Sequence, residues 1–106
     1  MLNDFLIKRG EFMKHVLVIY EIEDYKKWKR IYDDNTANRK INGSKEAYIY
    51  RNEDNHLELA VIYSWDDLDN ARKYFASEDF KNKMFAAGVH GEPEIRYIEE
   101  IERTIA

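Results

Sequence analysis

The chain has 106 residues with a formal net charge of −4, and 44% of its residues are hydrophobic while 36% are charged. This balance is typical of one soluble domain, and the acidic character argues against a nucleic-acid partner, because phosphate binding requires a basic surface. The sequence has no cysteine, which excludes disulfides, thiolate metal ligands and cysteine nucleophiles. No uncharged run approaches the roughly 20 apolar residues of a membrane span, so we expect no membrane partner and a cytoplasmic location.

Strand character starts abruptly at Met13, and the residues before it lack the apolar core of a secretory signal. The codons for Lys8 to Glu11 can contain GGAG, a ribosome-binding motif, just upstream of Met13. Our hypothesis is that residues 1–12 are an N-terminal extension, a translated leader of prokaryotic type. Residues 13–106 are then expected to form a single domain.

The first half of the chain predicts a strand and then a helix. Residues His15 to Glu21 (HVLVIYE) are rich in β-branched and aromatic side chains, which favours a strand. Asp24 is placed to cap a helix (DYKKWKRIYDDNTANRKING) that Gly43 ends. A stripe that begins aromatic and turns polar follows one side of this helix at spacings of 3, 4, 3 and 4 residues. Its members are Tyr25, Trp28, Tyr32, Asn35 and Arg39.

A hairpin follows the first helix. Glu46 to Arg51 (EAYIYR) and Leu57 to Trp65 (LELAVIYSW) both have strand composition, and the polar residues 52–55 (NEDN) between them are typical of a turn. These two strands are therefore expected to pair with each other.

The second half repeats the strand-then-helix plan. Asp66 or Asp67 is expected to cap a helix through Phe75, and Ser77 restarts it with two acids in the first turn. Gly88 is then in the position of a C-terminal helix cap. The helical part of this half is therefore predicted as two consecutive segments.

The last strand is predicted at Glu94 to Ile101 (EIRYIEEI), entered through Pro93, the only proline. The tripeptide VIY occurs at Val18 and again at Val61, each time followed by two residues and then acids that lead into a helical pattern. The chain thus contains one βαβ unit used twice. Two right-handed split βαβ units interleave into a four-stranded antiparallel sheet of order 4-1-3-2, an α+β ferredoxin-like fold.

Both faces of the predicted central strands are apolar. Two helices can cover only one face of a sheet, and a half-exposed sheet normally alternates apolar with polar residues. An uncovered apolar face would leave a large exposed patch, so we expect a twofold homodimer that buries it sheet to sheet, giving an α+β barrel. The dimer face is either the alternate face or the one formed by Leu17, Ile19, Ala60 and Ile62.

A spaced pattern resembles the dimeric α+β barrel superfamily, in its antibiotic-biosynthesis-monooxygenase-like branch. The pattern consists of Trp65, Ala71, Tyr74, Ser77, Phe80 and Lys81, and the segments EDYKKWKRIYDDN, RKINGS and AAGVHGEPEI are similar to small cyclase-like or monooxygenase-like proteins of that superfamily. The resemblance covers residues 13–102 and implies the fold more specifically than the reaction. It implies a range of activities, among them cofactor-independent oxygenation, heme degradation and ligand binding.

Heme degradation is not expected. By the resemblance, the heme-degrading members carry Asn, Trp and His at the positions of Ile19, Tyr74 and Met84, and this chain departs from them at all three. His15, His56 and His90 are scattered on a strand start, a turn and a loop, without metal-ligand spacing. We therefore expect no cofactor and no metal.

The candidate site residues are polar and aromatic side chains that could share one pocket. Asn35, Arg39 and Tyr74 are candidates for catalysis, because an amide, a guanidinium and a phenol can stabilise a developing oxyanion. The alternative for Arg39 is a helix-end cation that faces water. Aromatic side chains that could hold a flat ligand, or could simply be core, are Trp28, Tyr32, Tyr63 and Trp65.

Two functions remain open from the sequence. The first is a cofactor-independent monooxygenase or cyclase-like enzyme that acts on an aromatic or polyketide-like compound. The alternative is a non-catalytic metabolite-binding, stress or interaction module with the same fold. An open, partly polar cavity between helices and sheet favours the first, and a filled cavity favours the second.

Overall fold

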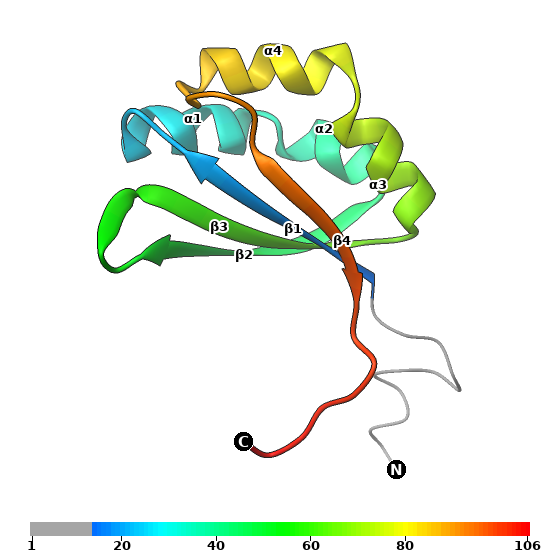
Figure 1. Ribbon diagram of the computed structural model, residues 1–106. Helices are drawn as coiled ribbons and strands as arrows, with labels where there is room; N and C mark the ends of the chain where they lie inside the picture. The colour runs from blue at the N-terminus through cyan, green and yellow to red at the C-terminus, as the bar shows by residue number, and fades with distance from the viewer. Residues whose placement is uncertain (1–13) are drawn as a thin grey trace.

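The computed structural model describes residues 14–106 (Figure 1). The predicted extension at residues 1–12 lies outside the described residues. The elements in chain order are β1 (Lys14–Glu21), α1 (Tyr25–Asp34), α2 (Thr36–Ile41), β2 (Ser44–Asn52), β3 (Asn55–Trp65), α3 (Leu68–Phe75), α4 (Glu78–Ala86) and β4 (Glu94–Glu99).

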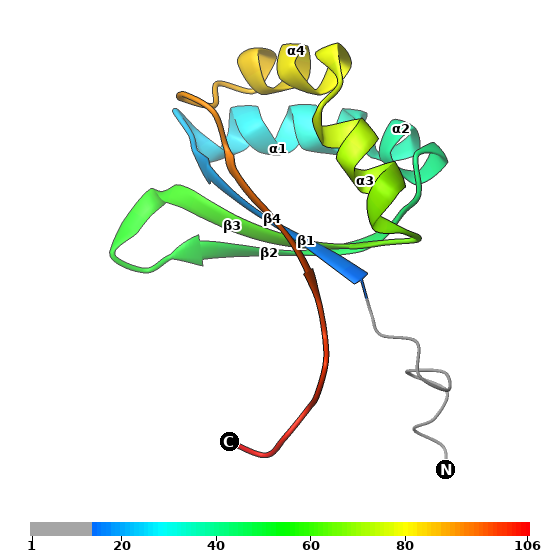
Figure 2. The same ribbon diagram turned by 45° about the vertical axis from the view of Figure 1, so that its right-hand side comes forward.

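The strands form one four-stranded antiparallel sheet of order β2-β3-β1-β4. This confirms the predicted strand order and the ferredoxin-like arrangement of two βαβ units. At the centre of the sheet Val18 of β1 lies opposite Val61 of β3 and Ile95 of β4. All four helices lie on the same side of the sheet, as Figures 1 and 2 show from two directions.

Side-chain caps begin the helices where the sequence places them. Asp24 accepts a hydrogen bond from the Lys27 N–H at 2.9 Å, and Asp67, rather than Asp66, accepts from the Asn70 N–H at 2.8 Å. The turn after α2 requires glycine, because Gly43 has φ of +112° and a Cβ there would collide with the Asp66 carboxylate. These local signals fix the entry and exit of the helices.

Several predicted boundaries are wrong. The hairpin turn occupies residues 53–54 rather than 52–55, because β2 ends at Asn52 and β3 begins at Asn55. The first helix is not continuous, because Asn35 has φ −95° and ψ 7° and separates α1 from α2. Its backbone N–H is shared between the Ile31 and Tyr32 carbonyls at 3.1 and 3.3 Å, which tightens the turn. The last strand ends at Glu99 rather than at Ile101, whose side chain is 73% exposed.

The helices cover one specific face of the sheet. Val16, Val18 and Tyr20 of β1 are at most 1% exposed beneath them, and the buried same-face residues of β3, from Leu59 to Trp65, are at most 3% exposed. The opposite face carries Leu17 and Ile19, which are only half-buried, and no helix lies over it. Of the two faces that the sequence left open, the helix-covered one is therefore that of Val16.

Within residues 14–106 no helix has the length and apolar character to cross a membrane.

Candidate functional site

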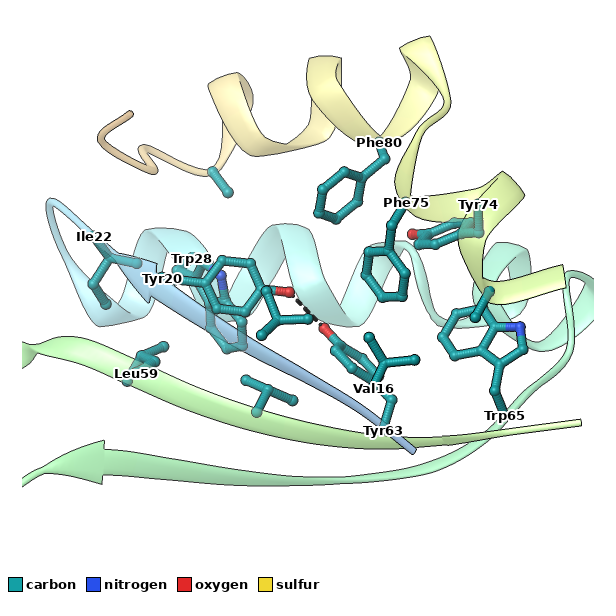
Figure 3. Close-up of a cluster of buried hydrophobic side chains, with 14 residues drawn as sticks. Val16, Tyr20, Ile22, Trp28, Leu59, Tyr63, Trp65, Tyr74, Phe75 and Phe80 are labelled. Carbon is teal, nitrogen blue, oxygen red and sulfur yellow. Dashed lines mark hydrogen bonds between the residues drawn. The ribbon is translucent and has the colours of Figure 1, made fainter. Parts of the chain in front are cut away.

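A small internal cavity lies between the helices and the sheet. Its volume is about 20 Å³, which is room for about one water molecule. Trp28, Tyr32 and Met84 are among its walls, and Phe80 reaches it from α4 (Figure 3). The residues of its lining that carry polar groups besides the Trp28 indole are Tyr20, Tyr32, Asn35, Arg39, Tyr63, Tyr74 and Lys83. Six of the seven predicted site residues therefore meet at one place.

Arg39 is buried, with 6% of its surface exposed, so it does not take the solvent-facing position considered as its alternative. Its Nη1 donates to the Tyr32 carbonyl at 2.9 Å and its Nη2 donates to the Thr36 hydroxyl at 3.1 Å. The guanidinium carbon stacks 3.7 Å from the centroid of the Tyr32 ring. These contacts hold the cation with its plane against an aromatic face.

No carboxylate in residues 14–106 lies within 4.0 Å of the Arg39 guanidinium. Buried cations are normally paired with an anion, since removing a charge from water costs several kcal/mol. Two of the five guanidinium N–H groups are used in the contacts with Tyr32 and Thr36. The cavity thus borders a positive charge with donor capacity to spare, which favours an oxyanion as ligand.

Asn35 lies at the break between α1 and α2, and its side chain contacts Tyr74 of α3. Its Nδ2 donates to the Tyr74 hydroxyl at 2.6 Å, and its Oδ1 accepts from Asn38 Nδ2 at 3.2 Å. The change of direction at Asn35 turns this side chain inward, where it is 6% exposed. The catalytic candidates Asn35 and Tyr74 are therefore in direct contact.

Tyr20 is a cavity residue that the sequence analysis missed. Its hydroxyl lies 2.7 Å from that of Tyr63, and the pair is buried at the centre of the core (Figure 3). The available signal was the alternation of β1, which places Tyr20 on the same face as Val16 and Val18.

Burial favours the neutral form of three cavity phenols, those of Tyr20, Tyr63 and Tyr74. It raises the pKa of Tyr20 and of Tyr63 well above the ordinary value of 10.0. Burial also raises the pKa of Tyr74, while the Arg39 charge and the hydrogen bond from Asn35 act in the opposite direction. At neutral pH these tyrosines are hydrogen-bond donors rather than bases.

Because the unfolded chain ionises these phenols near pH 10 and the folded chain does not, we expect stability to fall as pH rises above 10. The loss approaches 1.4 kcal/mol per pH unit for each of Tyr20 and Tyr63, about the value of one pKa unit. Urea unfolding at stepped alkaline pH measures it. Tyr63→Phe is expected to reduce the slope and Tyr25→Phe, at a position 41% exposed, to leave it unchanged. Equal slopes in all three proteins contradict the assignment.

The two tryptophans have different surroundings. Trp28 is 1% exposed, stacks on Tyr32 with ring centroids 4.9 Å apart, and lines the cavity. Trp65 does not line it; its Nε1 donates to the Asn42 carbonyl at 2.8 Å and its ring packs against Phe75. Trp65 therefore supports the site from outside.

Two depressions on the protein surface share lining residues with the internal cavity. A groove of about 430 Å³ runs between α4 and the segment that leads into β4, with Phe85, Val89 and Ile95 in its walls. A second cleft, of about 220 Å³, reaches Arg39 from the side of Lys40 and Lys45.

No group of three or more His, Asp or Glu side chains suited to a metal ion occurs among the described residues.

No family model matches the sequence, and no curated protein matches it. Among solved structures, a proposed antibiotic biosynthesis monooxygenase from Bordetella bronchiseptica is 10% identical, with a TM-score of 0.70, over 86% of this chain and 99% of that one. SnoaB, a cofactor-independent oxygenase from Streptomyces nogalater, is 16% identical, with a TM-score of 0.64, over 89% and 96%. The monooxygenase ActVA-Orf6 of Streptomyces coelicolor, in complex with nanaomycin D, is 11% identical, with a TM-score of 0.61, over 90% and 93%.

The chain has the fold of the antibiotic biosynthesis monooxygenases. The resemblance inferred from the Trp65-to-Lys81 pattern is thus confirmed at the level of the fold. The alignments cover 86–90% of this chain and 93–99% of each neighbour. Because these identities are low, the reaction has to be argued from the residues of the cavity.

Proposed function

We propose that this protein is a cytoplasmic homodimer that binds a small aromatic or polyketide-like oxyanion and acts as a cofactor-independent monooxygenase. The observation that carries the proposal is the buried Arg39 cation, which faces an aromatic cavity without a carboxylate partner within the described chain. The fold neighbours SnoaB, a cofactor-independent oxygenase, and ActVA-Orf6, bound to nanaomycin D, support it.

Each cavity residue has a role in this reaction. An electron-rich phenol or enol first loses its proton to bulk solvent. The resulting anion then supplies the electrons that reduce O₂, so that one oxygen atom enters the substrate and the other leaves as water. Arg39 stabilises the resulting oxyanion, while Asn35 and Tyr74 donate or accept hydrogen bonds beside it. Trp28 and Tyr32, stacked on one another, form an aromatic wall of the cavity, and the Arg39 guanidinium lies over the Tyr32 ring.

The alternative is a non-catalytic module whose cavity is closed by its own side chains. The small size of the cavity, about 20 Å³, favours this alternative. So does the finding that every buried side-chain N or O atom of the described residues has at least one hydrogen-bond partner. An aromatic ring enters only if cavity side chains move.

The dimer is proposed to form through the open face of the sheet. Tyr48 and Tyr50 of β2 are each 55% exposed on this face and Ile98 of β4 is 40% exposed. The central strands add the half-buried Leu17, Ile19, Ala60 and Ile62. A second copy of the same face is self-complementary under a twofold axis and buries this apolar surface.

Arg39→Met is expected to weaken binding of 2-naphthoate at least tenfold, because the buried cation is the partner of the carboxylate. Binding of the neutral 2-naphthamide is expected to change little, and Arg39→Lys is expected to retain part of the naphthoate affinity. Isothermal titration measures both ligands, and circular dichroism confirms that each variant is folded. Equal losses for naphthoate and naphthamide contradict a charge-specific role.

Oxygen uptake with anthrone, a tricyclic ketone that ionises to an electron-rich enolate, tests catalysis. The wild-type protein is expected to accelerate uptake without added metal or flavin, and Arg39→Met is expected to lose most of that rate. Binding without acceleration favours the non-catalytic alternative.

A further inference from the structure

We propose that the Met84 side chain is a movable gate between the internal cavity and the outer groove beside α4, and that the two spaces together form one elongated ligand site. The inference rests on the proposed function, because it takes the cavity at Arg39 as the place where a ligand binds. It adds the route of entry and the part of the site that holds the body of the ligand.

The two spaces share their dividing wall. Phe80 and Met84, one helical turn apart on α4, line both the internal cavity and the outer groove. The internal cavity, at about 20 Å³, is too small for an aromatic ring, whereas the groove, at about 430 Å³, has the size of a small-molecule site. Displacing this wall places the polar lining of the cavity at the inner end of the groove.

Of the two wall residues, Met84 is the one that can move. Phe80 is 4% exposed and packs edge-on against Phe75 with ring centroids 5.0 Å apart, and Tyr74 lies 5.7 Å away by the same measure. Figure 3 shows its ring directed from α4 toward the sheet. Met84 is only partly buried, and methionine is an unbranched side chain with several rotatable bonds. A change of its rotamers opens the wall without breaking the aromatic core.

The helix that carries the gate is weakly anchored. Within α4 only Phe80 is buried, and Phe85, on the neighbouring turn, is 87% exposed beside the groove. An exposed phenylalanine at the rim of an apolar groove supplies contact area for a bound ring. Few buried contacts also allow small shifts of a helix at low cost.

The chemistry of the joined site specifies its ligand. Most of the groove lining is apolar, as at Phe75, Val89 and Ile95, and Lys81 and Glu92 add one charge of each sign. The cavity beyond Met84 holds the Arg39 guanidinium. The site therefore fits a planar aromatic compound with an apolar body and a carboxylate, phenolate or enolate oxygen at one end. The ring system occupies the groove and the oxyanion reaches Arg39 past Met84.

Stopped-flow quenching of tryptophan fluorescence by 2-naphthoate tests the gate. Met84→Ala is expected to raise the association rate constant at least fivefold, because the wall is then permanently open. Met84→Leu, which keeps the volume but has fewer torsions, is expected to slow association. Phe85→Ala is expected to weaken the equilibrium affinity about threefold or more by removing ring contacts in the groove.

Two control variants locate the route. Ile41→Ala, at a position 84% exposed and outside both spaces, is expected to match the wild type. Lys45→Ala alters the second cleft that reaches Arg39; a change confined to this variant overturns the gate in favour of entry from that side. Wild-type binding that depends on Arg39 but not on Met84 or Phe85 also overturns the gate and leaves the proposed function intact. If neither wild type nor Met84→Ala binds naphthoate, the proposed function and the gate both fail.

Discussion

Replacing Ile62 with aspartate is expected to convert the protein from a dimer into a monomer. Ile62 lies in the middle of the open sheet face, opposite Leu17 of β1 and Tyr48 of β2. In a sheet-to-sheet dimer its side chain and its symmetry mate are buried among apolar groups, where an unpaired carboxylate costs several kcal/mol. Since 1.4 kcal/mol is a factor of about 10 in affinity, we expect a dissociation constant raised at least 100-fold.

Sedimentation velocity over a dilution series measures this change. In the monomer the aspartate faces water, so the Ile62→Asp variant is expected to keep the circular dichroism spectrum of the folded chain. Ile41→Asp is the matched control, because Ile41 is 84% exposed on α2, in the helical layer. A wild-type protein that sediments as a monomer, or an Ile62→Asp variant that remains a dimer, contradicts the proposed interface.

Replacing Trp28 with alanine is expected to lower the free energy of unfolding by about 3–5 kcal/mol, the usual cost of truncating a buried tryptophan. Trp28 is 1% exposed and joins α1 to the sheet: its ring stacks on Tyr32 and meets Tyr20 edge-on at a centroid distance of 5.4 Å. Because single domains are stabilised by only about 5–15 kcal/mol, this one change removes a large part of the total.

Urea unfolding followed by circular dichroism, at a fixed protomer concentration, checks the prediction. Ile41→Ala removes an apolar side chain from an 84% exposed position and is expected to change stability by no more than about 0.5 kcal/mol. A loss below about 1 kcal/mol for Trp28→Ala means that α1 is not held to the sheet by this ring. The same variant enlarges the cavity, so it is also expected to alter ligand binding.

The candidate site was only partly accessible to sequence reasoning. The helical spacing of Trp28, Tyr32, Asn35 and Arg39 placed them on one side of a helix, and that side faces the cavity. Tyr63 was found through its position in β3, whereas Tyr20, its hydrogen-bond partner from β1, was missed. The pairing of these hydroxyls depends on two strands being adjacent in the sheet, which no local pattern encodes.

The sequence by itself determined the local structure of this protein. The local signals are strand propensity, period-two alternation and the helix caps at Asp24 and Ser77. Because each acts over a few residues, they predict the helices and strands. The order of the strands in the sheet then follows from the repeated βαβ unit. The left-handed turn at Gly43 is equally local, since glycine adopts a φ of +112° without the steric strain that a Cβ would bring.

The tertiary structure alone decided which sheet face the helices cover and what Arg39 faces. Alternation makes both faces of β1 apolar and does not distinguish Val16 from Leu17; the packing of helices on one side does. A cation near the end of a helix is solvated when no other part of the chain packs over that end, and it is buried when another part does. Here the aromatic ring of Tyr32 and the helical layer enclose Arg39, and so a residue that local rules place in solvent borders the cavity instead.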